Sequence, residues 1–240
     1  MGRNADWYEA DVRTLFTPLA RAIGQLDDRI FLGVLLRCVA WSAVGFLVLH
    51  AAAVWAVQRL LDLHGALGWL AGVLASVGAS FLALWLFLPL AAAIGTLYID
   101  RIAAAVERRW YPYLPPARGA SLGGQIWDGV SLGGRILVLN LLALVLALIL
   151  PGIGLLLAWA IAAYAIGRGL FVAVAMRRMP RPAAEMLYRR ARVQVLAHGG
   201  IMALTAYLPL VNLLIPLLGT AAMVHVLDQA LTPGAPISRP

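Results

Sequence analysis

The stretch LPLVNLLIP, from Leu208 to Pro216, interrupts the second of two apolar blocks in the C-terminal half of this 240-residue chain. Proline lacks the backbone N–H that a helix interior needs, so a stretch with two prolines predicts a turn between two helices. The arm before it, Leu196 to Leu208, would be about 20 Å long as a helix, at about 1.5 Å per residue. Because the hydrocarbon core of a bilayer is roughly 30 Å thick, this arm is too short to cross it. We therefore expect residues 193–227 to form a re-entrant hairpin, which leaves the membrane on the side where it entered.

The first apolar block, residues 136–175, is interrupted in the same way by LPGIG at Leu150 to Gly154. A Pro-Gly pair ends a helix, since glycine also allows positive φ angles. This block is interpreted as a first re-entrant hairpin. The residues expected in the two turns are Pro151, Gly152 and Gly154 in the first hairpin and Pro209 and Pro216 in the second.

The composition indicates an integral membrane protein. Hydrophobic residues make up 62% of the chain and charged residues only 12%, whereas soluble domains have about 25% charged residues. No charged or Ser/Gly-rich linker separates two halves, so residues 1–240 are expected to form a single membrane domain.

Upstream of the hairpins, the sequence predicts two long helices. Residues 1–28 form a charged amphipathic segment suited to the membrane surface. Residues 31–57 and 66–110 are each long enough to span the bilayer, the second with a kink at Pro89. The glycine-rich residues 117–134 are expected to be flexible, and the tail from 232 to 240 to be disordered. The expected fold is therefore an all-α integral membrane protein with two long transmembrane helices and two re-entrant helical hairpins.

The distribution of positive charge predicts the topology. All 19 basic residues are arginine, and the net charge is +8. Arginines cluster before the first long helix, after the second and between the hairpins, so the positive-inside rule places both termini in the cytoplasm. The arginine-rich residues 177–194 are expected to contact anionic lipid headgroups rather than nucleic acid. A six-span arrangement gives the termini the same side, but it requires the short arms of the second hairpin to cross the bilayer.

Neither an enzyme nor a metal site is predicted. Cys38 is the only cysteine, and the four histidines show no ligand spacing. No nucleophile with a neighbouring acid and base, and no pair of carboxylates, converges at bilayer depth, so a catalytic site and a cofactor are not expected.

Several motifs resemble the CysZ-type sulfate permease family, whose superfamily includes the etoposide-induced membrane proteins of eukaryotes. They are the two hairpin turns, Thr205 and Gly219 around the second turn, and Glu185-Met186 ahead of an arginine-rich helix. The likeness extends from Leu19 to Asp228. It implies an oligomeric, multi-pass protein of the bacterial inner membrane that passes sulfate into the cytoplasm for cysteine synthesis. Of the family's adjacent arginine pair only Arg29 is present, and Ala104 replaces a glutamate of the family's motif.

Sulfate, or a similar oxyanion, requires fixed hydrogen-bond donors in place of its hydration shell, which arginine side chains, amide groups and helix N-termini supply. The candidate anion-binding residues are Arg29, Arg101, Arg108, Asn140 and Asn212. The alternative function is that of a non-transporting membrane scaffold or assembly protein, which the scarcity of polar groups at bilayer depth favours.

Overall fold

The computed structural model describes residues 16–61, 68–81, 97–119, 121–150, 152–206 and 208–232. These ranges contain helices and loops and no strand. A short helix at residues 16–23 precedes the longer elements. They are α2 (Arg29–Leu61), the helix Gly68–Phe81, α4 (Ile99–Trp110), α5 (Leu122–Ile149), α6 (Ile153–Met176), α7 (Arg181–Thr205) and α8 (Pro209–Leu231).

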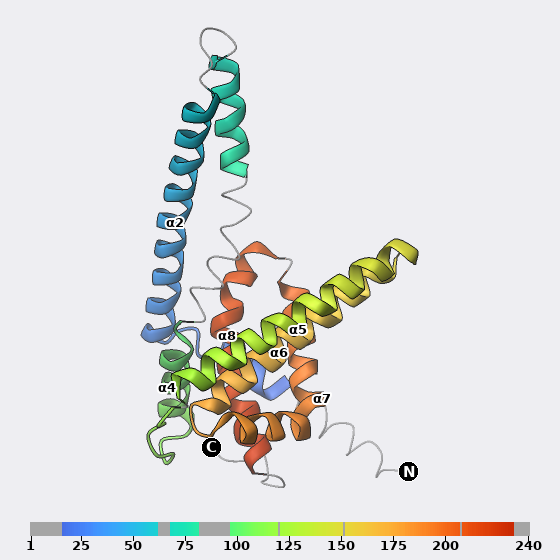
Figure 1. The fold of residues 1–240 in the computed structure, drawn as a ribbon. Coiled ribbons are helices and arrows are strands. Elements are labelled where there is room, and N and C mark those ends of the chain that lie inside the picture. Colours follow the sequence, from blue (N-terminus) through green and yellow to red (C-terminus); the bar gives the residue numbers. More distant parts are fainter. Residues whose placement is uncertain are drawn as a thin grey trace, which may run out of the picture.

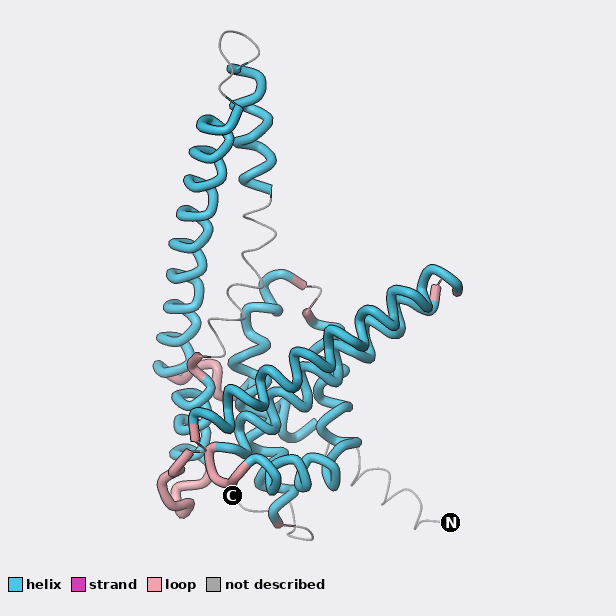
Figure 2. The backbone as a smooth tube through the Cα atoms, in the orientation of Figure 1, coloured by secondary structure: helices cyan, strands magenta, loops and turns pink. Residues whose placement is uncertain are grey.

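The helices form two projecting arms on a common base (Figure 1). One arm is α2 with the helix Gly68–Phe81, which meet where Ser80 Oγ lies 3.4 Å from His50 Nδ1. The other arm is the antiparallel pair α5–α6, which runs obliquely to α2. The base contains α4, α7, α8 and the C-terminal half of α6, and Figure 2 shows that the loop between α4 and α5 lies at its lower margin. The shared core of the molecule is therefore at one end, where all the long helices begin or end.

Two glycines bring α6 and α7 into close contact. A Cβ atom at Gly199 would lie 2.2 Å from the carbonyl oxygen of Ala163, and one at Gly167 would lie 2.6 Å from that of Val195. Small residues of this kind allow helix backbones to approach closely in membranes. Next to this crossing, Trp159 Nε1 donates a 3.0 Å hydrogen bond to the carbonyl of Gly200. The close backbone contact at these glycines is thus one of the features that hold α6 and α7 together.

Within the described residues, four helices are long and apolar enough to cross a membrane, and the protein is multi-pass. Their apolar segments are Arg29–Ala56, Gly123–Ile149, Ile153–Met176 and Leu214–Leu231. Large apolar side chains on α2 and α5 are exposed, as expected for surfaces that face lipid or another protein. The expectation of an all-helical membrane protein is confirmed for the described residues.

The structure differs from the sequence analysis in where the first hairpin begins. Residues 122–134 were expected to be a flexible loop, but α5 begins at Leu122. Ser121 caps its N-terminus, since the Ser121 Oγ accepts a hydrogen bond from the Gly124 amide. Asp128, within the same stretch, is held by Arg168 of α6. The cap and this pairing explain why a glycine-rich segment is helical.

The second hairpin also begins earlier than expected and its turn is shorter, so its helices of 25 and 23 residues are longer than the arm of about 20 Å expected before the turn. Helix α7 begins at Arg181 rather than at Val193, with Pro182 near its start, where a missing N–H costs nothing. Helix α8 begins at Pro209, and Pro216 lies inside it rather than in the turn. A proline in a long helix removes only one backbone hydrogen bond and can be accommodated by packing, and Pro216 is buried.

At the first turn, Gly152 has a left-handed backbone, with φ of 97°, which favours glycine. A Cβ at Gly154 would lie 2.8 Å from that of Ala147, so the two arms of this hairpin meet closely. Pro151, Pro89 and the tail residues 233–240 lie outside the described residues, as do residues 1–15 and the middle of the long helix expected at 66–110.

Candidate anion-binding site

A cavity of about 390 Å³ lies between the first turns of α2 and the length of α4. On α2 the lining residues recur every four positions, and on α4 every three or four, so each set forms one helix face. The lining consists of Arg29, Ile30, Gly33, Val34 and Arg37 from α2 and Arg101, Ala104 and Arg108 from α4.

The cavity is basic. Four arginines line it, and all four side chains are exposed. Within the described part of the chain, none of the four is paired with a carboxylate, and the guanidinium of Arg101 lies 5.5 Å from the centre of the Tyr98 ring. Unpaired guanidinium groups retain their N–H donors for a ligand, and they bind oxyanions in a geometry that matches two oxygen atoms. The cavity therefore has the chemistry of an anion-binding site.

The acids of α4 point away from the cavity. Arg177, at the C-terminal end of α6, donates from Nε to Asp100 at 2.9 Å and from Nη1 to Glu107 at 2.7 Å. Arg178 donates to both carboxylate oxygens of Glu107, at 3.1 and 2.9 Å. Arg178 also donates to the carbonyl of Pro115, at 2.9 Å, which ties the loop after α4 to α6.

Three of the five residues predicted from the sequence, namely Arg29, Arg101 and Arg108, lie together in this cavity. The two asparagines do not line it. Asn140 is exposed on α5, and its amide donates to the Ile136 carbonyl of its own helix at 3.0 Å. Asn212 lies in the first turn of α8, partly buried.

Arg37 is a lining residue that the sequence analysis did not select. It follows Arg29 by eight residues, which is close to two helical turns, and so it shares the same face of α2. That spacing could have identified it, together with Gly33 midway between the two arginines.

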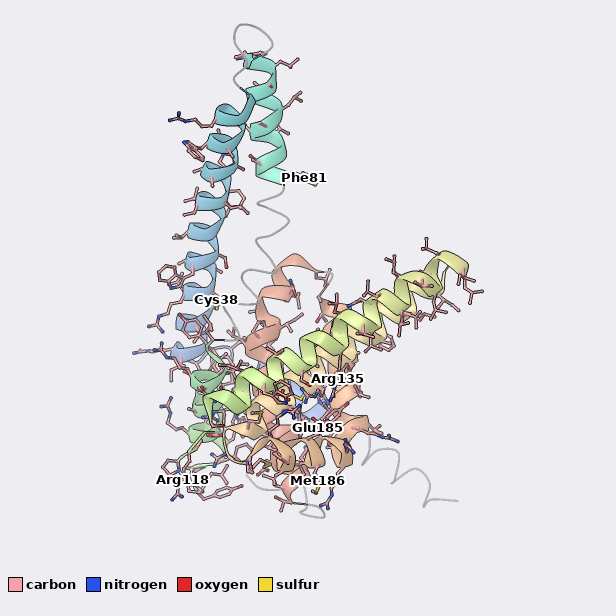
Figure 3. All side chains as sticks on the ribbon, in the orientation of Figure 1. Cys38, Phe81, Arg118, Arg135, Glu185 and Met186 are labelled. Atoms are coloured by element: carbon pink, nitrogen blue, oxygen red, sulfur yellow. The ribbon has the colours of Figure 1, made fainter. Side chains whose placement is uncertain are left out.

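A second charged cluster is buried between α5, α6 and α7, and its pairing was not predicted from the sequence. Arg168 is 1% exposed, and its guanidinium binds both oxygens of Asp128, at 2.8 and 2.7 Å, and Glu185 at 2.7 Å. Arg181 also binds Asp128, at 2.8 Å. Figure 3 shows Glu185 within the bundle, whereas the adjacent Met186 lies at its lower margin. Two arginines here meet two carboxylates, so this cluster is neutral, and the Nη1 and Nη2 donors of Arg168 are occupied by protein carboxylates.

A third polar contact joins the end of α4 to α8. The Tyr111 hydroxyl lies 2.7 Å from His225 Nδ1, and both side chains are buried. Burial, and secondly the charge of Asp228, hold the pKa of Tyr111 above its usual value, so its hydroxyl stays protonated. The guanidinium of Arg21 lies 5.0 Å from the ring centre of Trp110, next to Tyr111. These contacts fix one end of α4, and therefore one wall of the cavity.

Residues 19–216 match the family described as Sulfate transporter CysZ/Etoposide-induced protein 2.4. This range includes both walls of the arginine-lined cavity, all of α2 to α7 and the first turns of α8. No curated protein matches the chain.

The resemblance noted in the sequence is confirmed, because the matched range covers well over half of the chain and every helix that builds the cavity. The chain belongs to the Sulfate transporter CysZ/Etoposide-induced protein 2.4 family.

Proposed function

We propose that this protein is a permease or channel for an inorganic oxyanion, with sulfate as the substrate, and that it supplies the cytoplasm of a bacterium with sulfate for cysteine synthesis. The observation that carries the proposal is the cavity between α2 and α4, which four arginines line without a carboxylate partner among the described residues. Membership of a family whose description names a sulfate transporter supports the same substrate.

The physical chemistry of sulfate fits such a cavity. The ion carries two negative charges and is strongly hydrated, so a protein must replace water with fixed positive donors before the ion leaves bulk solution. Guanidinium groups donate two parallel hydrogen bonds to an oxyanion. Arg29 and Arg37 would hold the ion from α2, and Arg101 and Arg108 from α4. Exposure of all four side chains keeps the cavity accessible to ions from solution.

The proposed membrane arrangement has two long spans and two re-entrant hairpins, with both termini in the cytoplasm of a bacterial inner membrane. In Figure 1 the turn between α7 and α8 lies well below the far end of α2, in agreement with a hairpin that stops inside the bilayer. The N-terminal half of α7 contains exposed Arg189, Arg190 and Arg192, which suit contact with anionic headgroups on the cytoplasmic side. A homo-oligomer, with further helix contacts through the exposed apolar arm α5–α6, belongs to the same proposal.

Sulfate flux into proteoliposomes tests the function. Purified protein is reconstituted, and uptake of radiolabelled sulfate is followed with and without an excess of unlabelled sulfate, phosphate or chloride. We expect saturable sulfate uptake that Arg29→Ala lowers by about tenfold, since loss of one charge-assisted contact costs about 1.5–3 kcal/mol. Arg118→Ala is the matched control, because Arg118 is exposed but does not line the cavity. Equal uptake by Arg29→Ala and the unmodified protein would remove Arg29 from the pathway.

The alternative is a scaffold or assembly protein that transports nothing. The outward position of Asn140 favours it, since this polar residue of α5 serves its own helix rather than a path through the bilayer. Absence of flux of all three anions through a correctly folded oligomer would support the scaffold and contradict the permease.

A further inference from the structure

The charge of the arginine-lined cavity depends on two carboxylates that could cancel it. Asp100 precedes Arg101 and Glu107 precedes Arg108, so each acid of α4 is next to a cavity arginine in the chain. Successive residues of an α-helix are about 100° apart, because a turn contains 3.6 residues. Both acids therefore lie on a flank of the same helix, within reach of the cavity rim if their side chains were free.

Two arginines from the end of α6 hold these acids on the far flank. Arg177 contacts both of them, through Nε to Asp100 at 2.9 Å and Nη1 to Glu107 at 2.7 Å. Arg178 occupies both oxygens of Glu107. The Arg177 side chain is 9% exposed and that of Glu107 is 11% exposed, whereas Asp100 is 77% exposed. Glu107 is thus held by three nitrogen–oxygen contacts, at 2.7, 3.1 and 2.9 Å, and Asp100 by Arg177 alone among the described residues.

We propose that Arg177, with Arg178, is a positioning residue for anion binding: it neutralises the acids of α4 and keeps them away from the cavity, so that a bound anion interacts with uncompensated arginines. The four groups Asp100, Glu107, Arg177 and Arg178 sum to zero charge. Without Arg177, the set carries one net negative charge next to Arg101 and Arg108. This inference rests on the proposed anion-binding function of the cavity.

The competing explanation is that Arg177 only holds the helices together. Both explanations predict that Arg177→Gln destabilises the protein, because removal of one partner leaves a buried carboxylate with fewer contacts. They differ in what happens when an acid is also neutralised. If Arg177→Gln weakens sulfate binding through the charge near the cavity, adding Asp100→Asn restores binding. If it weakens binding because the contact between α4 and α6 is lost, adding Asp100→Asn does not restore binding, since it restores no contact.

The experiment measures the Kd for radiolabelled sulfate by equilibrium dialysis of the purified full-length protein at low ionic strength, where the electrostatic screening length is long. The variants are Arg177→Gln, Asp100→Asn and the double variant. Arg181→Gln is the matched control, because it breaks an ion pair with Asp128 in the other charged cluster, away from the cavity. Thermal unfolding of each variant is recorded in the same detergent.

We expect Arg177→Gln to raise the Kd for sulfate about three- to tenfold, because of the Coulomb energy of one charge near a divalent anion. The double variant should have a Kd within about twofold of that of the unmodified protein. Asp100→Asn alone leaves Arg177 bound to Glu107 and adds one net positive charge, so we expect its Kd to fall about twofold. Arg181→Gln should lose stability and leave the Kd unchanged.

A Kd for Arg177→Gln equal to that of the unmodified protein overturns the inference, and so does a double variant as weak as Arg177→Gln. If Arg177→Gln does not fold, Asp100→Asn decides, because its side chain is exposed, and a Kd that is unchanged or raised overturns the inference. Arg108→Ala tests the anion-binding role of the cavity separately from the positioning role of Arg177. If the unmodified protein binds sulfate and Arg108→Ala does not, the cavity is supported as the anion-binding site, whatever the result for Arg177→Gln. If the unmodified protein binds neither sulfate, phosphate nor chloride, both proposals are overturned.

Discussion

At the scale of single residues, α6 and α7 approach each other closely because the residues at their contact are glycines, which have no side chain. Gly199 on α7 faces Ala163 and Gly167 on α6, and a Cβ there would meet the Ala163 carbonyl at 2.2 Å. A carbonyl oxygen in a helix cannot move without disturbing the backbone hydrogen bond that it accepts. The position therefore excludes every residue except glycine, unless the two helices separate.

We predict that Gly199→Ala lowers the free energy of unfolding by about 3 kcal/mol, at the upper end of the usual cost of overpacking. The comparison is with Gly133→Ala on α5, where a new Cβ has no neighbour within 4 Å. There we expect a gain of about 0.5–1 kcal/mol, because alanine has the higher helix propensity. Thermal unfolding of the purified variants in detergent measures the change in stability of Gly199→Ala and of Gly133→Ala. Similar melting temperatures for the two variants would show that α6 and α7 do not meet at Gly199.

At the scale of elements, a buried charge cluster joins three helices that apolar packing alone would orient weakly. Arg168 interrupts an otherwise apolar helix, and its partners come from α5 and α7. A charge at such a position is costly unless it is paired and hydrogen-bonded, and the geometry of the pairs then fixes the rotation of each helix about its axis. The cluster anchors the N-terminal part of α5, since Asp128 lies on this helix and binds Arg168 and Arg181.

We predict that Asp128→Asn lowers the free energy of unfolding by about 3–5 kcal/mol, the usual cost of removing one partner of a buried ion pair. Arg168 would keep only Glu185 as a charged partner, and Arg181 would lose its carboxylate. The matched control is Asp27→Asn, which breaks a pair with Arg109 whose side chains are 75% and 44% exposed, and this change should cost less than about 1 kcal/mol. Equal unfolding temperatures for Asp128→Asn and Asp27→Asn would contradict a structural role for the cluster.

At the scale of the whole molecule, the position of the hairpin turns relative to the membrane decides the topology. Re-entrant hairpins place every arginine-rich segment on one side, as the positive-inside rule favours. Six complete spans would also place both termini in the cytoplasm, but they would place the α7–α8 turn on the periplasmic side. The two arrangements therefore differ at Val211, beside this turn, and agree at both ends of the chain.

We predict that a cysteine at Val211 resists a membrane-impermeant thiol reagent added to the periplasmic side of the cell. The native Cys38 is the only cysteine, and it is buried, so a Cys38→Ser background gives a protein with one reactive site. His64→Cys is the positive control, because the sequence predicts that His64 lies between the two long spans, and it should be labelled from the periplasm. Periplasmic labelling at Val211 would exclude the re-entrant arrangement and favour six spans.

The helical membrane class could be predicted from the amino-acid sequence alone, because long apolar runs and scarce charges leave few other solutions for a chain in a bilayer. The sequence also determined the family and selected three of the four cavity arginines, since residues on one helix face recur at a known spacing. It did not determine the beginning of α5, the partners of Arg168 or the capture of Asp100 and Glu107 by Arg177. The partners of Arg168 lie 17 and 40 positions away in the chain and those of Arg177 lie 70 and 77 positions away, and local periodicity carries no information about which helices meet. It is the packing of α6 against α4 that neutralises the acids of α4 through Arg177 and Arg178, and the cavity beside them is therefore basic.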